Sequence, residues 1–359
     1  YSSAASDVYK RQDLKWEKTG QFDIGFDLGL FNNRLRLTAD YYYKKTTDLL
    51  YNVAIPSASG YDSMLKNIGS VQNKGYELSI ESDNLSGAFS WTTAFNISFN
   101  RNKVLELGGE TYKDVGTYDD HLKTSDIRRL IVGQPIGVFY GYRFDGIFQN
   151  EAECAQQTSS PSPIGVGLRR YKDLNGDGKI DATNDREILG DANPKFFGGM
   201  TNTFAYKGFE LNVFLQYSYG NKIFNYNAME LESPTGGQNV YQDLVNRWTP
   251  TNPSNEYQKA TTNRNNIVSD RFIEDGSFLK LKTVSLSYSF PKLNWKHIGG
   301  LRLYVTGQNL LTWTKYRGYD PEVSYRGAST LEAGEDFGGY PQARTFMFGI
   351  KLDLSLIHI

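Results

Sequence analysis

Apolar and polar residues alternate along most of this chain. In "QFDIGFDLGL" (residues 21–30) an apolar side chain stands at every second position, with a polar residue or Gly between. A period of two over ten residues is typical of a β-strand with one apolar and one polar face. The alternation returns in "RLRLTADYYYKKT", "GYELSIES", "AFSWTTAFNISFN", "VSLSYSF", "LRLYVTG" and "TFMFGIKL". The pattern therefore predicts an all-β fold.

The stretch "GMTNTFAYKGFELNVFLQYSYG" (199–220) shows how two such strands join. The apolar positions are even up to Tyr206 and odd from Phe209 onward. This change falls at Lys207 and Gly208, where a two-residue hairpin turn would place it. We therefore expect antiparallel strands on either side of that turn.

Two-faced strands build either a soluble sheet with the apolar face inward or a membrane barrel with the apolar face toward lipid. Soluble strands usually run about 5 to 6 residues, whereas a bilayer-spanning strand takes about 9 to 11. The strands here are long, and the Tyr-rich ends "DYYYKK" and "QYSYG" fit the aromatic girdle of a barrel, although aromatic pairing in a soluble sheet would also use them. The expected lipid-facing residues are Phe22, Ile24, Phe26, Leu28, Leu37, Ile97 and Val213. The expected polar lumen residues include Asp23, Asp27, Arg36 and Glu77.

The connectors alternate between short and long, as the periplasmic turns and extracellular loops of an outer-membrane barrel do. The short ones are 31–33, 83–87, 207–208 and 291–300. The long ones are 51–70, 105–195, 225–276 and 315–343. This alternation predicts about nine spanning strands of one large antiparallel transmembrane barrel. It also places "VFYGYRFDGIF" (138–148) inside the extracellular excursion 105–195 rather than in a tenth spanning strand.

Both ends of the chain read as translated sequencing adapters. "SSAASDVYKRQ" (2–12) reverse-translates, in one reading, to the adapter and transposase end used to tag DNA libraries, and "LSLIHI" (354–359) translates the reverse complement of its last codons. We therefore expect 1–12 and 354–359 to be non-native, and 13–353 to be a barrel fragment.

Composition narrows the class of protein. The 39 Lys and Arg residues nearly balance the 40 Asp and Glu residues, so the chain offers no basic footprint for nucleic acid. Cys154 is the only cysteine, which excludes a disulfide framework, and we expect it to be an ordinary loop residue. No apolar run approaches the length of a membrane helix.

The sequence offers little for catalysis, and we expect no enzyme. Outside the adapter-like ends, His121 and His297 are the only histidines, both in predicted connectors, and no nucleophile motif accompanies them. Acidic residues such as Asp320 and Glu322 are plentiful, but their spacing does not set two carboxylates across a cleft.

The stretch "DLNGDGKID" (173–181) has the oxygen-ligand spacing of a calcium loop, with Gly178 at the sharp turn. The predicted ligands of a structural Ca²⁺ are Asp173, Asn175, Asp177, the Lys179 carbonyl, Asp181 and, in place of the usual Glu, Asp185 or Asn184. Such a substitution predicts weak affinity. The alternative is a turn rich in Asn and Asp whose side chains bond the local backbone without metal.

Aromatic residues in the predicted loops are candidate substrate contacts, because they can stack on sugar rings. The candidates are Tyr112, Tyr118, Trp248 and Tyr340. Packing inside the loops would use each of them equally well. Two other classes of protein stay open on these grounds: a calcium-stiffened extracellular β-sandwich that binds carbohydrate, and a secreted glycan-cleaving enzyme.

Several segments resemble one family closely and in its order. They include "DLKWEKTGQFDIGFDLGLFNNRL", "NKGYELS", "GVFYGYRFDGIFQ", "DLNGDGKID", "NRWTP", "RFIEDGSFLKLKTVSLSY", "TGQNLLTWTKYRGYDPEV" and "YPQARTFMFGIKL". Together they resemble the C-terminal half of a SusC/RagA-type TonB-dependent outer-membrane transporter. The resemblance implies a barrel of about 22 strands in the cell outer membrane, with a plug domain upstream. It also implies a SusD-like surface lipoprotein as partner, energy supplied through the TonB complex, and import of oligosaccharide or peptide oligomers.

Overall fold

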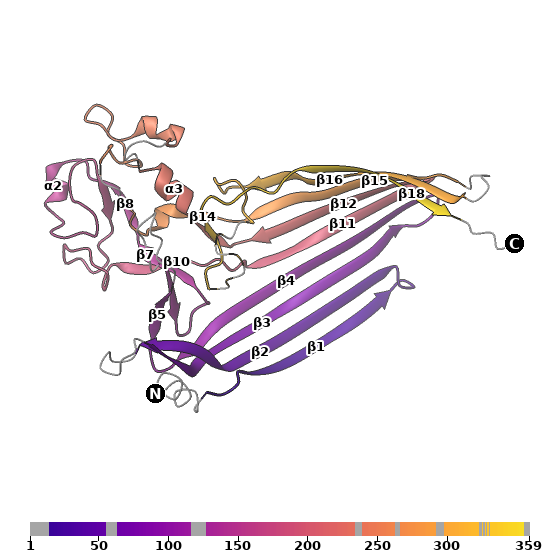
Figure 1. The fold of residues 1–359 in the computed structure, drawn as a ribbon, viewed down its shortest axis with the longest axis horizontal. Helices are drawn as coiled ribbons and strands as arrows, with labels where there is room; N and C mark the ends of the chain where they lie inside the picture. Colours follow the sequence, from indigo (N-terminus) through magenta and orange to yellow (C-terminus); the bar gives the residue numbers. More distant parts are fainter. Residues whose placement is uncertain are drawn as a thin grey trace, which may run out of the picture.

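A nine-stranded antiparallel sheet forms most of the molecule in the computed structural model (Figure 1). The structure describes residues 14–54, 63–115, 127–233, 239–262, 266–291, 298–322, 325, 327, 329 and 331–354. The strands lie in the order β1 (Lys18–Leu30), β2 (Leu35–Ala54), β3 (Ser63–Leu85), β4 (Phe89–Leu107), β11 (Phe196–Tyr206), β12 (Phe209–Tyr219), β15 (Phe278–Ser289), β16 (Ile298–Thr314) and β18 (Thr345–Leu354). Every neighbour in the sheet is also the next of these strands in the chain. The predicted all-β fold with nine long strands is confirmed.

The register of the sheet gives it two chemically different faces. Directly paired residues share a face, and successive residues of a strand alternate between faces. One row of paired residues is apolar on all eight strands that it crosses: Leu28, Leu37, Ile80, Phe95, Met200, Leu215, Leu281 and Leu311. The adjacent row carries polar side chains or Gly: Asp27, Thr38, Ser79, Asn96, Gly199, Gln216, Lys280 and Thr312. We call the two sides the apolar face and the polar face.

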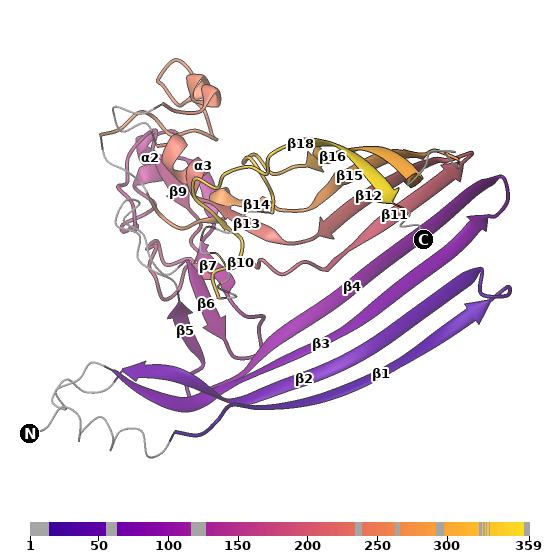
Figure 2. The same ribbon diagram turned by 45° about the vertical axis from the view of Figure 1, so that its right-hand side comes forward.

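The short turns lie at one end of the sheet and the long loops at the other (Figures 1 and 2). Lys207 and Gly208 have positive φ angles of 45° and 86°, as a two-residue turn between twisted strands requires. The predicted loop 51–70 is too long, because residues 51–54 and 63–70 continue β2 and β3. Backbone pairing there makes the β2–β3 pair longer than its side-chain alternation, which fades in this stretch. Strands also reach up to three residues into other predicted connectors, at 83–85, 105–107 and 298–300.

The long loops carry smaller elements of their own. Residues 138–148 form β7 (Val138–Tyr142) and β8 (Phe144–Ile147), which lie outside the nine-stranded sheet. The other loop strands are β5 (Tyr112–Val115), β6 (Arg128–Ile131), β9 (Arg169–Tyr171), β10 (Arg186–Gly190), β13 (Lys222–Asn225), β14 (Ile273–Asp275) and β17 (Glu335–Asp336). The short helices are α2 (Glu151–Cys154), α3 (Tyr226–Leu231), η2 (Gln242–Asn246) and η3 (Asp270–Phe272).

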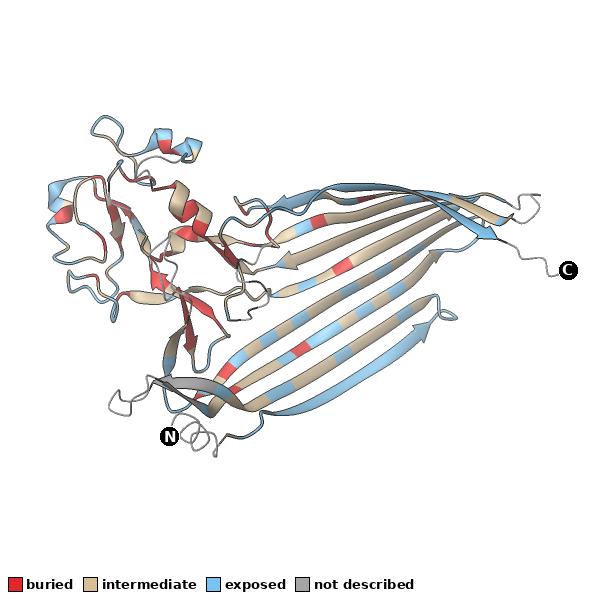
Figure 3. Cartoon of the chain, viewed as in Figure 1, coloured by how far each residue is buried: buried red, intermediate tan, exposed pale blue. Residues whose placement is uncertain are grey.

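The buried core lies among the loops rather than on the large sheet (Figure 3). Its main cluster includes Phe139, Phe224, Met229 and Phe272, contributed by two different loops. Cys154 lies in the long loop 108–195, where it ends α2 and is buried, and burial raises the pKa of its thiol. On the sheet, by contrast, β1 is exposed along its whole length.

Candidate functional site

The polar face carries the ionisable and hydrogen-bonding groups of the sheet. Thr38 donates a hydrogen bond to Asp27 on the next strand (2.6 Å), and Arg36 pairs with Glu81 across β2 and β3 (2.9 Å). Asp23 and Glu77 lie on the same face by register. A row of exposed polar groups of this kind suits a water-filled lumen.

The loop between β16 and β18 folds back onto this polar face. Lys280, in the polar row of β15, donates to Asp320 (2.6 Å) and to Glu322 (2.5 Å). Gln216 in the same row also donates to Glu322 (2.9 Å). Two residues further along β15, Lys282 sits in a β-bulge that neither neighbouring strand pairs, and its ammonium also reaches Glu322 (2.8 Å). A bulge can re-aim a side chain in this way.

These contacts form a luminal latch, which we define as Gln216, Lys280, Lys282, Asp320 and Glu322. Burial favours the neutral form of both carboxyls, but hydrogen bonds from the lysines outweigh it, so the pKa of Asp320 and that of Glu322 lie below their ordinary values. The latch therefore holds residues 315–322 to the wall most firmly when both carboxyls are ionised.

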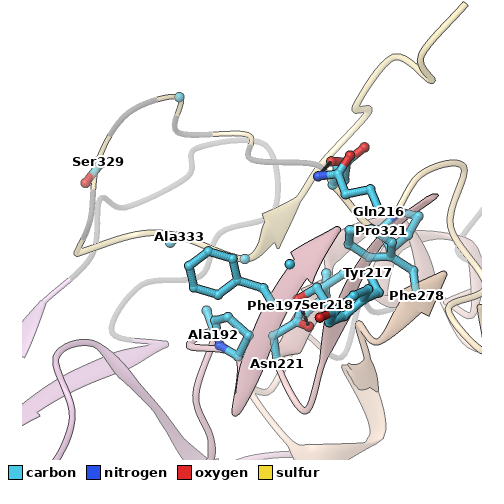
Figure 4. A pocket seen from close by; sticks show the side chains of 16 residues that line it. Ala192, Phe197, Gln216, Tyr217, Ser218, Asn221, Phe278, Pro321, Ser329 and Ala333 are labelled. Atoms are coloured by element: carbon cyan, nitrogen blue, oxygen red, sulfur yellow. Dashed lines mark hydrogen bonds between the residues drawn. The ribbon is translucent and has the colours of Figure 1, made fainter. Parts of the chain in front are cut away.

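A pocket of about 480 Å³ opens beside the latch (Figure 4). Phe197 and Phe278 line it from one row of the polar face, with Ser218 paired between them. Pro321 and Glu322 close it from the β16–β18 loop. Figure 4 shows the Phe197 ring between the sheet and the loop segment that carries Ala333. The pocket thus combines aromatic surface with amide, hydroxyl and carboxylate groups at the loop end of the polar face.

A buried group of charges joins the three longest loops. The Glu232 side chain is fully buried and pairs with Arg271 (2.7 Å), Arg317 (3.0 Å) and Arg169 (3.9 Å). Arg169 belongs to loop 108–195, Glu232 and Arg271 to loop 220–277, and Arg317 to loop 315–344. We call these four residues the Glu232 hub. Burial lowers the pKa of Arg169, the most deeply enclosed of the three arginines.

A second buried ion pair repeats the pattern. Arg128 on β6 pairs with Glu335 on β17 at 2.8 Å, with both side chains almost fully buried. Its guanidinium also lies 4.3 Å from the centre of the Phe139 ring. Loops 108–195 and 315–344 are therefore joined directly by this pair and indirectly through Glu232, which makes the loop end of the sheet one packed unit.

The predicted calcium loop closes as a turn held by its own carboxylates. Asp173 accepts hydrogen bonds from the backbone N–H groups of Gly176 (2.6 Å) and Gly178 (2.7 Å), and these bonds lower its pKa. Asp181 accepts from Thr183 and Asn184, and the fully buried Asp185 accepts from Leu174 and Asp181. In the described part of the chain, no three Asp, Glu, His or Cys side chains are grouped as a metal site. These hydrogen bonds fit the metal-free turn; calcium binding stays a prediction.

The four candidate substrate aromatics do not form one site in the described structure. Tyr112 on β5 lies over Arg129, whose guanidinium carbon is 3.9 Å from the ring centre. The Trp248 indole N–H donates to Gln149 (3.1 Å), and Tyr340 is 90% exposed. Tyr118 lies outside the described residues. None of the three described aromatics lines the pocket, so their role as substrate contacts stays a prediction.

All seven residues predicted to face lipid lie on the apolar face. Phe22, Ile24, Phe26 and Leu28 are exposed on β1, and Leu37 is paired directly with Leu28. Ile97 and Val213 fall on the same side through the pairing of β3, β4, β11 and β12.

In the sequence Asp320 and Glu322 stand out as acidic residues, but the residues that hold them do not. Gln216 and Lys280 stand in ordinary polar positions of their strands, so the alternation alone did not mark them. Lys282 could have been found from a change in the alternation along β15. Apolar residues stand at odd positions from Leu279 to Leu281 and at even positions from Val284 onward, so one residue between them must bulge.

One exposed apolar face, one polar face with a pocket, and loops gathered at a single end define a segment of an outer-membrane β-barrel wall. The sandwich alternative is wrong, because the long strands form one sheet rather than two packed over an apolar core. Among the described residues, no helix is long and apolar enough to cross a membrane.

Comparison with known proteins gives the family. Residues 1–150 match the family described as "TonB dependent receptor-like, beta-barrel". "TonB-dependent receptor P3" of Formosa agariphila is 41% identical over 353 residues, covering 96% of this chain and 35% of that protein. "TonB-dependent receptor SusC" of Bacteroides thetaiotaomicron is 29% identical over 362 residues, covering 98% of this chain and 33% of that protein. This chain belongs to the TonB-dependent receptor β-barrels of the SusC/RagA type, in the outer membrane.

The solved structures agree with the sequence relatives. "Structure of the RagAB peptide transporter" is 27% identical with a TM-score of 0.77, covering 95% of this chain and 36% of that chain. The "open-open" state of the RagAB peptide importer also gives a TM-score of 0.77, at 26% identity. The chain spans about a third of the length of the curated relatives that it matches.

Proposed function

We propose that the parent protein imports oligomers across the outer membrane, with this chain as part of the barrel wall that the cargo passes. The observation that carries the proposal is the pocket at the loop end of the polar face, next to a loop that the luminal latch holds against the wall. Cargo that entered from the loop end would meet this pocket before the rest of the polar face. Because the relatives are named as receptors and transporters, we favour a transport role for the parent protein over catalysis.

The proposed cargo is a peptide or glycan oligomer. The pocket offers two Phe rings next to Gln216, Ser218 and Glu322, a combination that stacks on flat or apolar groups and hydrogen-bonds to amides or hydroxyls. The similarity to a structure titled a peptide transporter supports a peptide as the cargo. The proposed partners are a SusD-like surface lipoprotein and the TonB energy-transducing complex.

The test is uptake by cells that carry the full-length receptor and its SusD-like partner. Labelled oligopeptides and oligosaccharides are supplied separately, in strains with and without TonB. We expect uptake of one oligomer class, lost without TonB. Uptake that is equal in both strains would contradict the proposal and indicate a passive pore.

The pocket itself is tested by Phe278→Ala, compared with Phe348→Ala on the apolar face of β18. We expect the first to raise the half-saturating cargo concentration several-fold, because an aromatic stacking contact is worth about 0.5 to 1.5 kcal/mol. The second should leave it unchanged. Equal effects of the two variants would exclude the pocket from the cargo path.

A further inference from the structure

Four cations gather on the apolar face at the loop end of strands β2 to β4. Lys74 of β3 is paired directly with Arg101 of β4. In the next row outward, Lys45 of β2 and Lys103 of β4 flank Gln72. All four side chains are exposed. We call Lys45, Lys74, Arg101 and Lys103 the basic patch.

The patch lacks its own counter-charges. Like charges placed directly opposite on neighbouring strands destabilise a sheet, yet Lys74 and Arg101 occupy such a pair. Within the described part of the chain, none of the four cations makes an ion pair. Asp48, the acidic residue just beyond Lys45 on β2, pairs with Lys18 instead (3.7 Å). An anion from outside the chain would remove this repulsion.

The row beneath the patch fixes its height in the membrane. Lys74 and Arg101 lie one row above Tyr76 and Phe99, and the Tyr76 ring is 5.0 Å from that of Tyr41. Aromatic rows of this kind mark the boundary between the hydrocarbon core and the polar headgroups. The patch therefore lies at the level of the headgroups, on the side where the long loops are.

Arg101 is also held in place. Its guanidinium donates to the backbone carbonyls of Asn100 (2.8 Å) and Lys195 (2.9 Å), so it is fixed between β4 and the start of β11. Arginine recognises phosphate oxygens through several N–H groups, and lysine adds a point charge. A fixed arginine beside three flexible lysines suits a phosphate group rather than a single carboxylate.

We propose that the basic patch binds the phosphate groups of the glycolipid in the outer leaflet, a lipopolysaccharide with its acyl chains along the apolar rows below. The inference rests on the proposed orientation of the barrel, with the apolar face toward lipid and the long loops outside. Occupancy by such a lipid would neutralise the Lys74–Arg101 pair and seat the receptor at a defined depth.

The test uses the purified, delipidated full-length receptor in detergent, with bis-phosphorylated lipid A as the probe and native mass spectrometry as the readout. Lys74→Gln with Arg101→Gln should weaken lipid A binding roughly tenfold to thirtyfold, because each cation near an anionic surface contributes roughly a fivefold share. The matched control is Lys44→Gln with Lys207→Gln: Lys44 lies on the polar face at the same height and Lys207 in an opposite-end turn. It should bind lipid A as the wild type does.

Further probes separate the sources of phosphate. Dephosphorylated lipid A should bind the wild type at least as weakly as intact lipid A binds the double variant, which keeps Lys45 and Lys103, and millimolar inorganic phosphate should not displace lipid A. Displacement by free phosphate, or equal binding by both double variants, would overturn the inference. Heat-modifiable migration checks that each variant is folded, and Lys45→Gln with Lys103→Gln gives an independent pair.

The outcome is separate from that of the import proposal. A receptor that binds lipid A through the patch but takes up no oligomer would refute import alone. A receptor that imports oligomers in a TonB-dependent way, with lipid A binding unaffected by either double variant, would refute the patch alone.

Discussion

Glu322 shows how one side chain positions a loop over the polar face. It accepts hydrogen bonds from Gln216, Lys280 and Lys282. Charge-assisted bonds to a half-buried carboxylate are each worth roughly 1.5 to 3 kcal/mol. We therefore expect Glu322→Gln in the full-length receptor to loosen the β16–β18 loop without unfolding the barrel, measured as lower anisotropy of a fluorophore on Ser329→Cys.

The same carboxylate predicts a pH dependence. The pKa of Glu322 and that of Asp320 are depressed in the folded state, so their stabilisation is complete above the unfolded pKa of roughly 4 and is lost as the pH falls through the lower folded values. The label should therefore become mobile only in acid. Glu256→Gln, at an exposed position of loop 220–277, is the control, and a flat anisotropy profile in the wild type would contradict the latch.

Single side chains also decide whether the acidic loop 173–181 binds Ca²⁺ or forms a metal-free turn. Asp173 and Asp177 would be Ca²⁺ ligands if metal binds, whereas Asp185 ties Leu174 and Asp181 together without any metal. We expect Asp173→Ala with Asp177→Ala to abolish calcium-dependent protection of the loop against protease on whole cells, while the barrel keeps its heat-modifiable migration. Asp185→Ala should instead expose the loop both with calcium and with chelator, because it removes the backbone ties. If the wild-type loop is cut equally fast with calcium and with chelator, the segment is only a turn and does not bind calcium.

At the scale of the strand, the register allows a sharp test of which face meets lipid. Leu78 and Ser79 are neighbours on β3 that lie on opposite faces. Leu78→Arg should cost roughly 2 to 4 kcal/mol in folding titrations into lipid vesicles, whereas Ser79→Arg should cost much less. Gly25 would be a poor control, because a Cβ there would clash with the side chain of Asp40. Equal costs at Leu78 and Ser79 would exclude an outward apolar face.

The sequence predicts the parts of the structure that depend on local patterns, and it does not predict the parts that depend on contacts between distant residues. Alternation is a local signal that burial enforces at every second residue, so it predicted the strands, their faces and the turn at Lys207. The contacts of the latch and of the second buried ion pair join residues far apart in the chain: Lys280 and Asp320 are 40 positions apart, and Arg128 and Glu335 are 207 apart. No local pattern encodes such pairs. The acidic spacing of 173–181 is local, but a turn and a metal loop use the same residues.

At the scale of the whole molecule, the Glu232 hub couples three loops that leave the sheet at separate points. Glu232→Gln would remove the buried carboxylate that Arg169, Arg271 and Arg317 share, while Arg317 keeps a second carboxylate, that of Glu274 (2.9 Å). Breaking a buried pair in this way costs roughly 3 to 5 kcal/mol. We expect this change in the full-length receptor to make loops 108–195, 220–277 and 315–344 sensitive to added protease together, while heat-modifiable migration persists, because the sheet does not depend on the hub. Arg170→Gln, which removes the more exposed pairs with Asp145 and Glu153, is the matched control and should cost less than about 1 kcal/mol. Cleavage confined to loop 220–277 would show that the loops open independently, and the loop end would then not act as one unit over the pocket.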